Sequence, residues 1–448
     1  MGWQVRPLAE IADCCLGKML DKQKNRGEPR PYLRNVNVRW FEFDLSDLLE
    51  MPFETSERER YSVRKGDLVV CEGGYPGRCA IWEDDEPVFF QKALHRVRCH
   101  EPERAKWVQY FLWMSDADDS LRSHFTGSGI QHLTGQALAR LKIPLPPLEE
   151  QRRIVAVLDD AFAAIATATA NAEKNRANAR EFFEALLRDL LFDTDGKMTS
   201  MGNVTDMKVG FAFKSHGYTA DADGIRLIRG DNIVQGRFRW DDVKRWPRAN
   251  AVEYADYRLE VGDVILAMDR TWVKAGLKFA VIGPDDVPSL LVQRVARLRA
   301  NIATTNDYVS LQIASAPFTD YVLDIQTGLG VPHISGKQIA DFRFVLPNRT
   351  KQDEIVRIAK EAKAACEGLV SAYDRKLLQL ANLKQSLLHR AFSGELTSNP
   401  TAVVAVNDNF ATPEFAAKIV AFAYERHVAE NRVRNFGTVK AEKILHMV

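Results

Sequence analysis

The chain has 448 residues, of which 46% are hydrophobic and 27% charged, and this length predicts about three folding units rather than one. It has no uncharged apolar run of about 18 residues and no apolar stretch after Met1, so we expect a soluble, cytoplasmic protein without a membrane span or signal peptide. The six cysteines form no C-x-x-C pair, which predicts reduced structural thiols and no metal site.

The net charge is only +1, so the chain lacks the overall basic excess that is common in nucleic-acid-binding proteins. Two local basic clusters, at 26–65 and 226–248, stand out from this average. Charge alone leaves open whether these clusters bind a polyanion or are simply solvated faces.

The first 147 residues carry short apolar runs that are broken by glycine, proline, asparagine and aspartate. Gly66-Asp67, for example, leads directly into Leu68-Val69-Val70, which is typical of a strand after a turn. We therefore expect residues 1–147 to form a mixed, strand-rich lobe.

Residues 148–193 are rich in alanine, leucine, glutamate and arginine and contain no proline. A proline-containing segment at 143–147 precedes them, where a helix is expected to begin. Apolar residues recur in steps of three and four at Ile154, Leu158, Phe162 and Ile165. The pattern predicts a helix of about 40 residues, roughly 60 Å long.

Residues 197–349 repeat the first lobe with an offset near 200 residues. Four segments recur in the same order: 32–38 as 227–233, 61–70 as 257–266, 129–135 as 330–336, and 145–155 as 346–356. Because an internal repeat determines the architecture, we expect a second lobe of the same fold.

A second proline-free segment at 350–396 has apolar residues at helical spacing from Leu369 to Leu387. One face of each long helix must be covered, and the helix of the other half is the obvious partner, in an antiparallel coiled coil. The predicted fold class is α+β: two repeated strand-rich lobes joined by two long antiparallel helices with pseudo-twofold symmetry.

The repeat ends near residue 396, and residues 401–448 form a separate C-terminal extension. Here a helix is expected from Pro413 to about Arg432, and a second helix begins near Asn435. Because about 45 residues bury little core alone, we expect this extension to pack on the lobes or on a partner subunit. The pattern is also compatible with a truncated domain.

Two similar lobes about a pseudo-twofold axis match the repeat of B-DNA, which presents two half-sites at a fixed spacing. The lobes diverge at equivalent loops, so we expect the half-sites to differ and the helices to set the distance between them. The arrangement predicts a reader of an asymmetric, bipartite DNA site.

The junction at 129–155, which contains Gly129-Ile130-Gln131-His132-Leu133 and then Pro146-Pro147-Leu148-Glu149-Glu150-Gln151, closely resembles a junction in the specificity subunits of type I restriction–modification enzymes. In the second copy, 348–351 (Asn-Arg-Thr-Lys) replaces the usual proline-acidic lead. The resemblance covers residues 1–396. It implies target recognition domains at 1–147 and 197–349 and conserved helical regions at 148–193 and 350–396.

The same resemblance implies a non-catalytic subunit that binds double-stranded DNA and two methyltransferase subunits, with restriction subunits added for DNA cleavage. The chain is then expected to hold no cofactor of its own. S-adenosylmethionine is expected on the methyltransferase subunit, and ATP and Mg²⁺ on the restriction subunit.

Catalytic motifs are missing from the sequence. There is no Asn/Asp-Pro-Pro-aromatic motif for amino-methylation, and the loop at 73–77 lacks the Lys-Ser/Thr of a phosphate-binding loop. His132 and His333 stand at equivalent places beside glycine turns, where a structural or DNA-backbone role is favoured over catalysis. Two alternatives stay open: a coiled-coil scaffold between protein partners, and a nuclease or methyltransferase with an unrecognised site.

Reading of base edges favours arginine, lysine, asparagine and glutamine on loops, and loops are where two copies of one fold can diverge. The DNA contacts expected in the first lobe are Arg34, Asn37, Tyr75, Arg78, Gln91, Lys92 and His95. Those expected in the second lobe are Arg229, Asn232, Asp269, Arg270, Thr271, Trp272, Lys274 and Gln293. Loops 72–78 and 268–274 are taken as equivalent, whereas Arg34, Asn37, Arg229 and Asn232 have a second interpretation as residues that bond their own turns.

Overall fold

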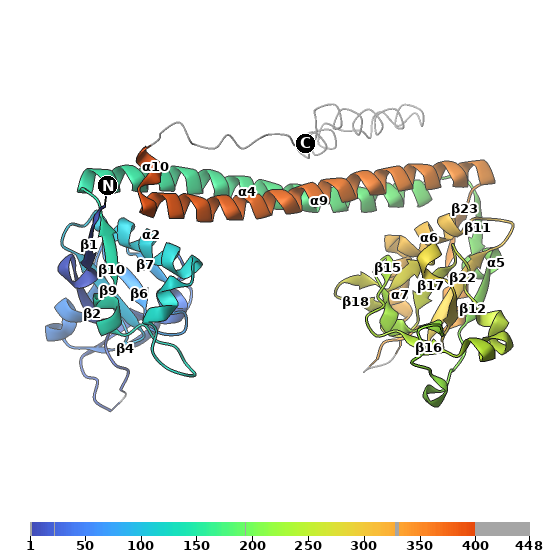
Figure 1. Ribbon diagram of the computed structural model, residues 1–448, viewed down its shortest axis with the longest axis horizontal. Coiled ribbons are helices and arrows are strands. Elements are labelled where there is room, and N and C mark those ends of the chain that lie inside the picture. The colour runs from blue at the N-terminus through green and yellow to red at the C-terminus, as the bar shows by residue number, and fades with distance from the viewer. Residues whose placement is uncertain (1, 22, 193, 328–330, 399–448) are drawn as a thin grey trace. The chain divides into compact units, whose positions relative to one another are not determined.

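The computed structural model of the chain describes residues 2–21, 23–192, 194–327 and 331–398. The C-terminal extension predicted at 401–448 lies outside the described residues. The chain divides into two compact units, one containing residues up to 173 together with 375–398, and the other containing 174–374 (Figure 1). Each unit therefore combines one lobe with half of each long helix, and the division falls within the helices rather than at their ends.

The first lobe is built on two four-stranded sheets and a strand pair. One sheet has the order β2-β9-β6-β7, with strands Ala12–Leu16, Leu94–Cys99, Leu68–Cys71 and Cys79–Ile81. The other has the order β4-β3-β8-β5, with strands Leu49–Phe53, Glu28–Leu33, Val88–Phe90 and Ser62–Val63. The antiparallel pair consists of β1 (Gln4–Pro7) and β10 (Lys142–Leu145).

The helices of the first lobe are α1 (Arg58–Tyr61), α2 (Arg104–Ala117) and α3 (Gly135–Ala139). Single 3-10 turns are η1 (Leu8–Glu10), η2 (Asn35–Asn37), η3 (Thr55–Glu57) and η4 (Ser120–His124). Helix α2 supplies the largest core side chain, since Trp107 is fully buried.

The second lobe repeats this plan. Its four-stranded sheet has the order β12-β22-β17-β20, with strands Thr205–Val209, Val295–Ala300, Val264–Ala267 and Phe279–Val281. A three-stranded sheet has the order β16-β13-β21, with strands Lys244–Trp246, Ile225–Ile228 and Ser289–Leu291. The antiparallel pair consists of β11 (Lys197–Ser200) and β23 (Arg343–Leu346).

Two hairpins complete the strands of the second lobe: β14 (Ile233–Val234) with β15 (Arg237–Phe238), and β18 (Trp272–Val273) with β19 (Gly276–Leu277). Its helices are α5 (Met201–Val204), α6 (Asn306–Ala314), α7 (Ala316–Ile325) and α8 (Gly336–Asp341). The 3-10 elements are η5 (Ser215–Gly217), η6 (Gly230–Asn232), η7 (Arg248–Tyr257) and η8 (Pro284–Asp286). The shared strand order confirms the repeated α+β fold predicted from the sequence.

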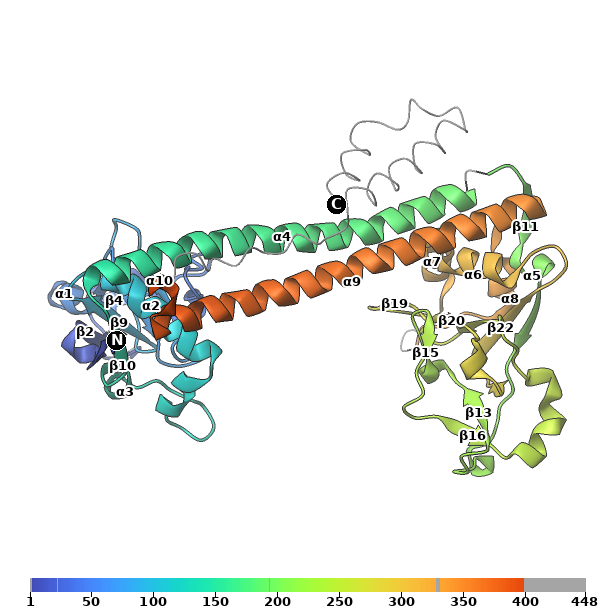
Figure 2. The same cartoon turned by 45° about the horizontal axis from the view of Figure 1, so that its top comes forward.

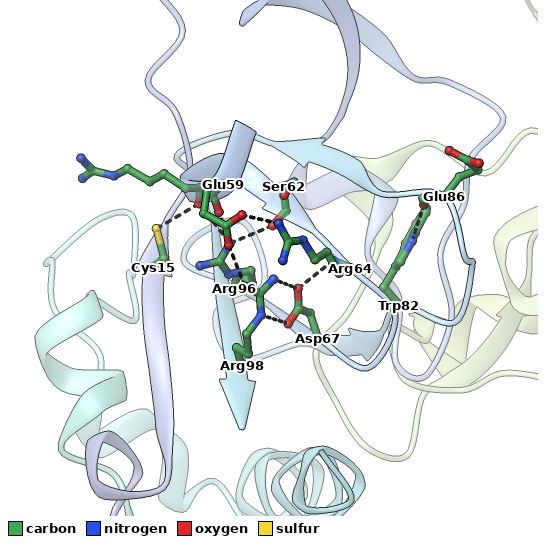
Figure 3. A network of polar contacts seen from close by, with 10 residues as sticks. Cys15, Glu59, Ser62, Arg64, Asp67, Trp82, Glu86, Arg96 and Arg98 are labelled. Atoms are coloured by element: carbon green, nitrogen blue, oxygen red, sulfur yellow. Dashed lines mark hydrogen bonds and ion pairs between the residues drawn. The ribbon is translucent and has the colours of Figure 1, made fainter. Parts of the chain in front are cut away.

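The Gly-Asp turn before β6 positions a buried carboxylate (Figure 3). Gly66 has a φ of +88°, which glycine adopts without steric cost. Arg98 of β9 donates two hydrogen bonds of 2.7 Å to the carboxylate of Asp67, and the Arg64 amide donates a third, also of 2.7 Å. The carboxylate thus ties the turn to the neighbouring strand.

The second lobe contains the same arrangement before β17. Gly262 has a φ of +93°, and Arg299 of β22 donates two hydrogen bonds of 2.7 Å to buried Asp263. The Glu260 amide donates to the same carboxylate at 2.8 Å. The repeated Gly-Asp motif therefore has a structural role, which is to tie the turn to the neighbouring strand, rather than a role in DNA binding.

The long helices are α4 (Leu148–Phe192) and α9 (Arg349–Ser393), with the short α10 (Glu395–Ser398) after them. In the first unit Leu158 of α4 and Leu388 of α9 share one core. In the second unit Ala179 packs with Leu369, and Arg176 forms a 2.8 Å ion pair with Asp374. Because the residue numbers rise along α4 as they fall along α9, the helices are antiparallel in each unit (Figure 2).

The two long helices begin with the same contact despite their different leads. The buried amide of Gln151 donates to the Pro146 carbonyl at 2.8 Å, and the amide of Gln352 donates to the Pro347 carbonyl at 2.9 Å. In the second copy Asn348 Oδ1 also accepts from the Lys351 amide at 3.0 Å, as a helix N-cap does. Asn348 thereby replaces the proline-acidic lead of the first copy.

Helix α4 is the one helix of the described residues that is long and apolar enough to cross a membrane, with a mean hydropathy of 1.4 over 18 residues. A search for uncharged runs misses it, because Asp159 and Asp160 interrupt the apolar sequence. One such helix is weak evidence for a membrane span, and 17% of its apolar window is buried within the protein. Ile154 and Leu158 are buried in the core of the first unit.

Candidate nucleic-acid interface

Three loops of the first lobe lie against one another, and we call them the first loop cluster: 34–44 after β3, 72–78 between β6 and β7, and 91–93 between β8 and β9. Asn35 Nδ2 donates to the Gly73 carbonyl at 3.2 Å, and the Glu72 amide donates to the Ala93 carbonyl at 2.9 Å. These contacts bring together residues that lie far apart in the sequence.

The second loop cluster consists of 229–239, 268–278 and 292–294. Gln235 Nε2 donates to the Gly276 carbonyl at 3.2 Å, and the Met268 amide donates to the Arg294 carbonyl at 2.9 Å. The two clusters occupy equivalent places, because they connect equivalent strands of the two lobes.

Backbone hydrogen bonds establish which residues of the clusters correspond. The Cys71 amide donates to the Arg78 carbonyl at 2.8 Å, and the Ala267 amide donates to the Lys278 carbonyl at 3.0 Å. Arg78 therefore corresponds to Lys278, each directly before the next strand.

The loop lengths explain why this correspondence differs from the one expected from the sequence. Seven residues separate β6 from β7, whereas eleven separate β17 from β20 and include the β18–β19 hairpin. The expected match of 72–78 to 268–274 is thus corrected to 268–278. The sequence does carry a signal, because Arg78-Cys79-Ala80-Ile81 recurs as Lys278-Phe279-Ala280-Val281.

Arg34 and Asn37 both bond within their own turn. Asn37 is buried, accepts from the Arg34 amide at 2.9 Å and donates to the Asp44 carbonyl at 2.9 Å. The guanidinium of Arg34 pairs with Asp47 at 2.6 Å. These contacts match the second interpretation of the pair, so we leave Asn37 out of the proposed DNA-contacting surface.

The same turn recurs in the second lobe. Buried Asn232 accepts from the Arg229 amide at 3.2 Å and donates to the Arg239 carbonyl at 3.2 Å. Arg229 pairs with Asp231 at 2.8 Å. Asn232 is left out for the same reason as its counterpart.

Tyr75 and Arg78 lie together in the first loop cluster. The guanidinium carbon of Arg78 is 5.1 Å from the centroid of the Tyr75 ring, and one terminal nitrogen donates to the Asn35 carbonyl at 3.0 Å. Tyr75 is 43% exposed and donates to Asp116 at 3.1 Å. Arg78 is thus held in place by a ring and a carbonyl, and no carboxylate of the described residues neutralises it.

Gln91, Lys92 and His95 differ widely in exposure. Lys92 is exposed and Gln91 is half-buried, whereas His95 is fully buried with Nε2 at 2.9 Å from the Leu133 carbonyl. Burial lowers the pKa of His95. His95 therefore lies in the interior beneath the loops, where a base edge does not reach it.

Asp269, Arg270 and Thr271 begin the longer loop of the second cluster. Thr271 is buried and donates to the Met268 carbonyl at 3.1 Å. Arg270 is exposed with a φ of +46°, and its amide donates to the Pro332 carbonyl at 2.6 Å. Asp269 pairs with Arg294 at 3.3 Å.

Trp272, Lys274 and Gln293 are exposed in the loops of the second cluster. Trp272 begins the β18–β19 hairpin and is 38% exposed, and Lys274 lies in the turn of that hairpin. Gln293 corresponds to Lys92. The Gln293 amide donates to the Phe211 carbonyl, just after β12, and the Lys92 amide donates to the Lys18 carbonyl, just after the equivalent strand β2.

Lys278, Arg294 and Arg239 were missed by the sequence analysis. Burial lowers the pKa of Lys278, and the nearby cations Arg239 and Arg270 lower it further. Arg294 is exposed with a φ of +64°, in a region that non-glycine residues seldom adopt. The second cluster therefore gathers more positive charge than the predicted residues alone supply.

His132 and His333 hold equivalent loops. The backbone of His132 bridges Gly73 and Thr126, and that of His333 bridges Asp269 and Thr327. Both residues thereby join a loop of the cluster to the segment that leads into the long helix. This position matches the structural role favoured from the sequence.

Among the described residues, no group of three or more histidine, cysteine, aspartate or glutamate side chains is placed to hold a metal ion. The six cysteines are free, and burial raises the pKa of the Cys71 thiol to about 11. Thiols with so high a pKa are poor nucleophiles at neutral pH.

Comparison with known proteins gives a consistent family. The type I restriction modification DNA specificity domain matches residues 1–177. The EcoAI specificity subunit of Escherichia coli is 34% identical over 193 residues, which are 43% of this chain but 31% of that relative. The EcoKI specificity subunit of Escherichia coli K12 is 22% identical over 89% of this chain and 90% of its own length.

Two solved structures share the fold. A chain from a structure of type I restriction–modification complex assembly has a TM-score of 0.68 at 17% identity, covering 88% of this chain and 98% of its own. The HsdS subunit of Thermoanaerobacter tengcongensis has a TM-score of 0.57 at 18% identity, covering 88% of this chain and 97% of its own.

Proposed function

We propose that the chain is a specificity subunit of a type I restriction–modification enzyme and that it reads an asymmetric, bipartite DNA site on behalf of methyltransferase subunits. It catalyses no reaction itself. The observation that carries this proposal is that two lobes of one strand order present differing loop clusters at the same place.

A shared scaffold with different loops suits the reading of two different half-sites. The strands hold the loops in position, while the loops vary in length and charge without disturbing the core. Arg78 of one cluster corresponds to Lys278 of the other, and Lys92 corresponds to Gln293. Different donors at equivalent places would favour different bases in the two half-sites.

The proposed DNA-contacting residues are those whose polar groups remain available at the surface of the clusters. In the first lobe they are Tyr75, Arg78, Gln91 and Lys92. In the second lobe they are Arg270, Trp272, Lys274, Lys278 and Gln293. Arg34, Arg229 and Asp269 would act by positioning the loops, because Arg34 pairs with nearby Asp47, and Arg229 and Asp269 pair within the second loop cluster.

The same proposal implies the partners of the chain. Two methyltransferase subunits would carry S-adenosylmethionine and the catalytic residues, and restriction subunits would carry ATP and Mg²⁺. We place this complex in the cytoplasm. The target adenine would be flipped out of the duplex into the methyltransferase pocket, while this chain keeps hold of the flanking half-sites.

The test is methyl transfer to a DNA library that is randomised over the whole candidate site. The chain alone, the methyltransferase subunit alone, and the two combined are each incubated with S-adenosylmethionine, and methylated molecules are sequenced. We expect methylation only from the combination, at adenines within two unlike half-sites at a constant spacing.

Two outcomes would contradict the proposal. Methyl transfer by the purified chain alone would make it an enzyme with an unrecognised site. Sequence-independent methylation by the combination, with no DNA binding by the chain, would leave it as a scaffold between protein partners.

A further inference from the structure

We propose that Lys278 is the base-reading counterpart of Arg78 and that each of the two residues recognises a guanine, one in each half-site. This inference rests on the proposed function, because it names the base that each loop cluster would read. The position, the unpaired charge and the donor chemistry of the two side chains support it.

The position of the two cations is equivalent in the two lobes. Each is the last residue of its loop, each accepts a hydrogen bond at its carbonyl from the preceding strand, and each is followed by the next strand. Its backbone is therefore held on both sides by the sheet, which gives the side chain a more precise origin than a loop tip would. Arg270 has no cationic counterpart in the first lobe, because Gly74, which also has a positive φ, takes its place there.

The charge of Lys278 has no partner among the described residues. Its side chain is half-buried, yet no hydrogen bond or ion pair engages Nζ. Asp231 and Asp269 lie near enough to influence it, but Asp231 pairs with Arg229 and Asp269 pairs with Arg294. A partly desolvated ammonium without a partner is unfavourable in the free protein. This state is expected of a group whose hydrogen-bond partners are supplied by a bound ligand.

Arg78 is in a comparable state. One terminal nitrogen donates to the Asn35 carbonyl, and the Tyr75 ring supports the guanidinium. Its Nε is buried without an acceptor. The guanidinium also interacts with the Cys71 thiol, so the fork is already oriented, and a base contact would come from its terminal N–H groups rather than from Nε.

Guanine is the base that matches both side chains. Arginine and lysine carry donors and no acceptors, so they favour a base that offers two adjacent acceptors. Guanine alone does so in the major groove, through O6 and N7. The exposed carboxylate-paired cations of the clusters, such as Arg294, lack this freedom because an acidic partner already occupies them.

The experiment is methylation of the randomised library by complexes that contain wild-type chain, Lys278→Ala, Lys278→Arg, Arg78→Ala or Arg270→Ala. Lys337→Ala is the matched control, since Lys337 is an exposed lysine of the same lobe that lies in α8, outside the second loop cluster. Circular dichroism and complex formation show that each variant is folded. Removing Lys278 deletes a half-buried charge without a partner, so the lobe is expected to keep its fold.

In the wild type we expect a guanine at one position of each half-site. Lys278→Ala should reduce discrimination for that guanine about ten- to hundredfold in one half-site only. Arg78→Ala should do the same in the other half-site, and Lys278→Arg should retain guanine. Lys337→Ala should leave the base preferences unchanged.

The inference is overturned if Lys278→Ala leaves the profile of the wild type unchanged, if the position that it relaxes is not guanine, or if Arg270→Ala rather than Lys278→Ala relaxes it. Each of these outcomes presupposes specific methylation by the wild-type complex. If the wild-type complex itself methylates no defined site, the proposed function has failed instead.

Discussion

At the scale of single residues, the repeated carboxylates Asp67 and Asp263 determine how the loops are supported. Each lies buried before a core strand and receives two hydrogen bonds from an arginine on the neighbouring strand. Removing one member of such a buried pair leaves an uncompensated charge, which is far more costly than losing an exposed ion pair.

Arg98→Ala should therefore destabilise the first lobe by about 3 kcal/mol. Amide exchange should then be roughly a hundredfold faster in those strands whose exchange requires unfolding of the lobe. The measurement is hydrogen–deuterium exchange of peptides from β6 and β9. Arg30→Ala is the control, because Arg30 and Glu28 form an exposed pair. Equal exchange in the two variants would show that the buried pair contributes little.

His95 makes a second residue-scale prediction, on pH. Since the Leu133 carbonyl only accepts, Nε2 carries the proton, and buried Nδ1 has no acceptor for another. Burial accordingly lowers the pKa of the folded His95, so the unfolded chain binds the proton more readily. The first lobe therefore has its full stability above the imidazole pKa of the unfolded chain, about 6.5. Its free energy of unfolding falls as the pH drops from that value toward the lower pKa of His95 in the folded protein.

The second lobe supplies an internal reference, because Ala296 takes the place of His95. The pH is lowered from about 7 to about 5.5, a range that spans the ordinary imidazole pKa. After correction for the intrinsic pH dependence of amide hydrogen exchange, the exchange should accelerate more in β6 and β9 than in β17 and β22. His95→Asn should remove this difference. An equal response of the two lobes in the wild type would contradict the prediction.

At the scale of elements, the β18–β19 hairpin is the principal difference between the two loop clusters. It lengthens the second loop and carries exposed Trp272 and Lys274. The strands on either side pair as they do in the first lobe, so the hairpin is an insertion into a complete scaffold. Loops of this kind are tolerated with little thermodynamic cost.

Replacing residues 268–277 by the shorter segment 72–77 should therefore leave the second lobe folded. The recognised half-site should change while the other half-site stays constant. The measurement is library methylation combined with hydrogen exchange of β17 and β20. Unfolding of these strands, or an altered preference in both half-sites, would show that the hairpin is part of the core or that the lobes do not read independently.

At the scale of the whole molecule, α4 and α9 each contribute to both compact units. Within each unit they pack in antiparallel fashion, so an insertion in one helix alone would break the register of the pair. We therefore interpret the two helices as the part of the chain that determines half-site spacing.

Matched insertions of four residues, after position 173 in α4 and after 374 in α9, test this interpretation. Four residues add about 6 Å along a helix axis and rotate the remainder of the helix by about 40°. We expect a longer spacer between two unchanged half-sites in the methylated library. The control carries the insertion in α4 alone and should lose specific methylation. Altered half-sites at a constant spacing would contradict the role of the helices.

The sequence by itself determined the α+β class, the two repeated lobes and the presence of two long helices. These features depend on local signals: the period of apolar residues, proline before each helix, glycine at positive φ in the Gly-Asp turns, and recurrence of whole segments. The first three signals act over a few neighbouring residues, and the recurrence is found by comparing the sequence with itself, so none of them requires knowing what packs against it.

Only the tertiary structure decided which polar residues are free for a ligand. Asn37, Asn232, His95 and Thr271 have the side chains of DNA readers, but their burial and partners come from the fold around them. The correspondence of Arg78 with Lys278 likewise emerged from hydrogen bonds between strands, because a loop insertion shifts the apparent match in the sequence. Burial depends on segments distant along the chain, and residue type alone does not reveal it.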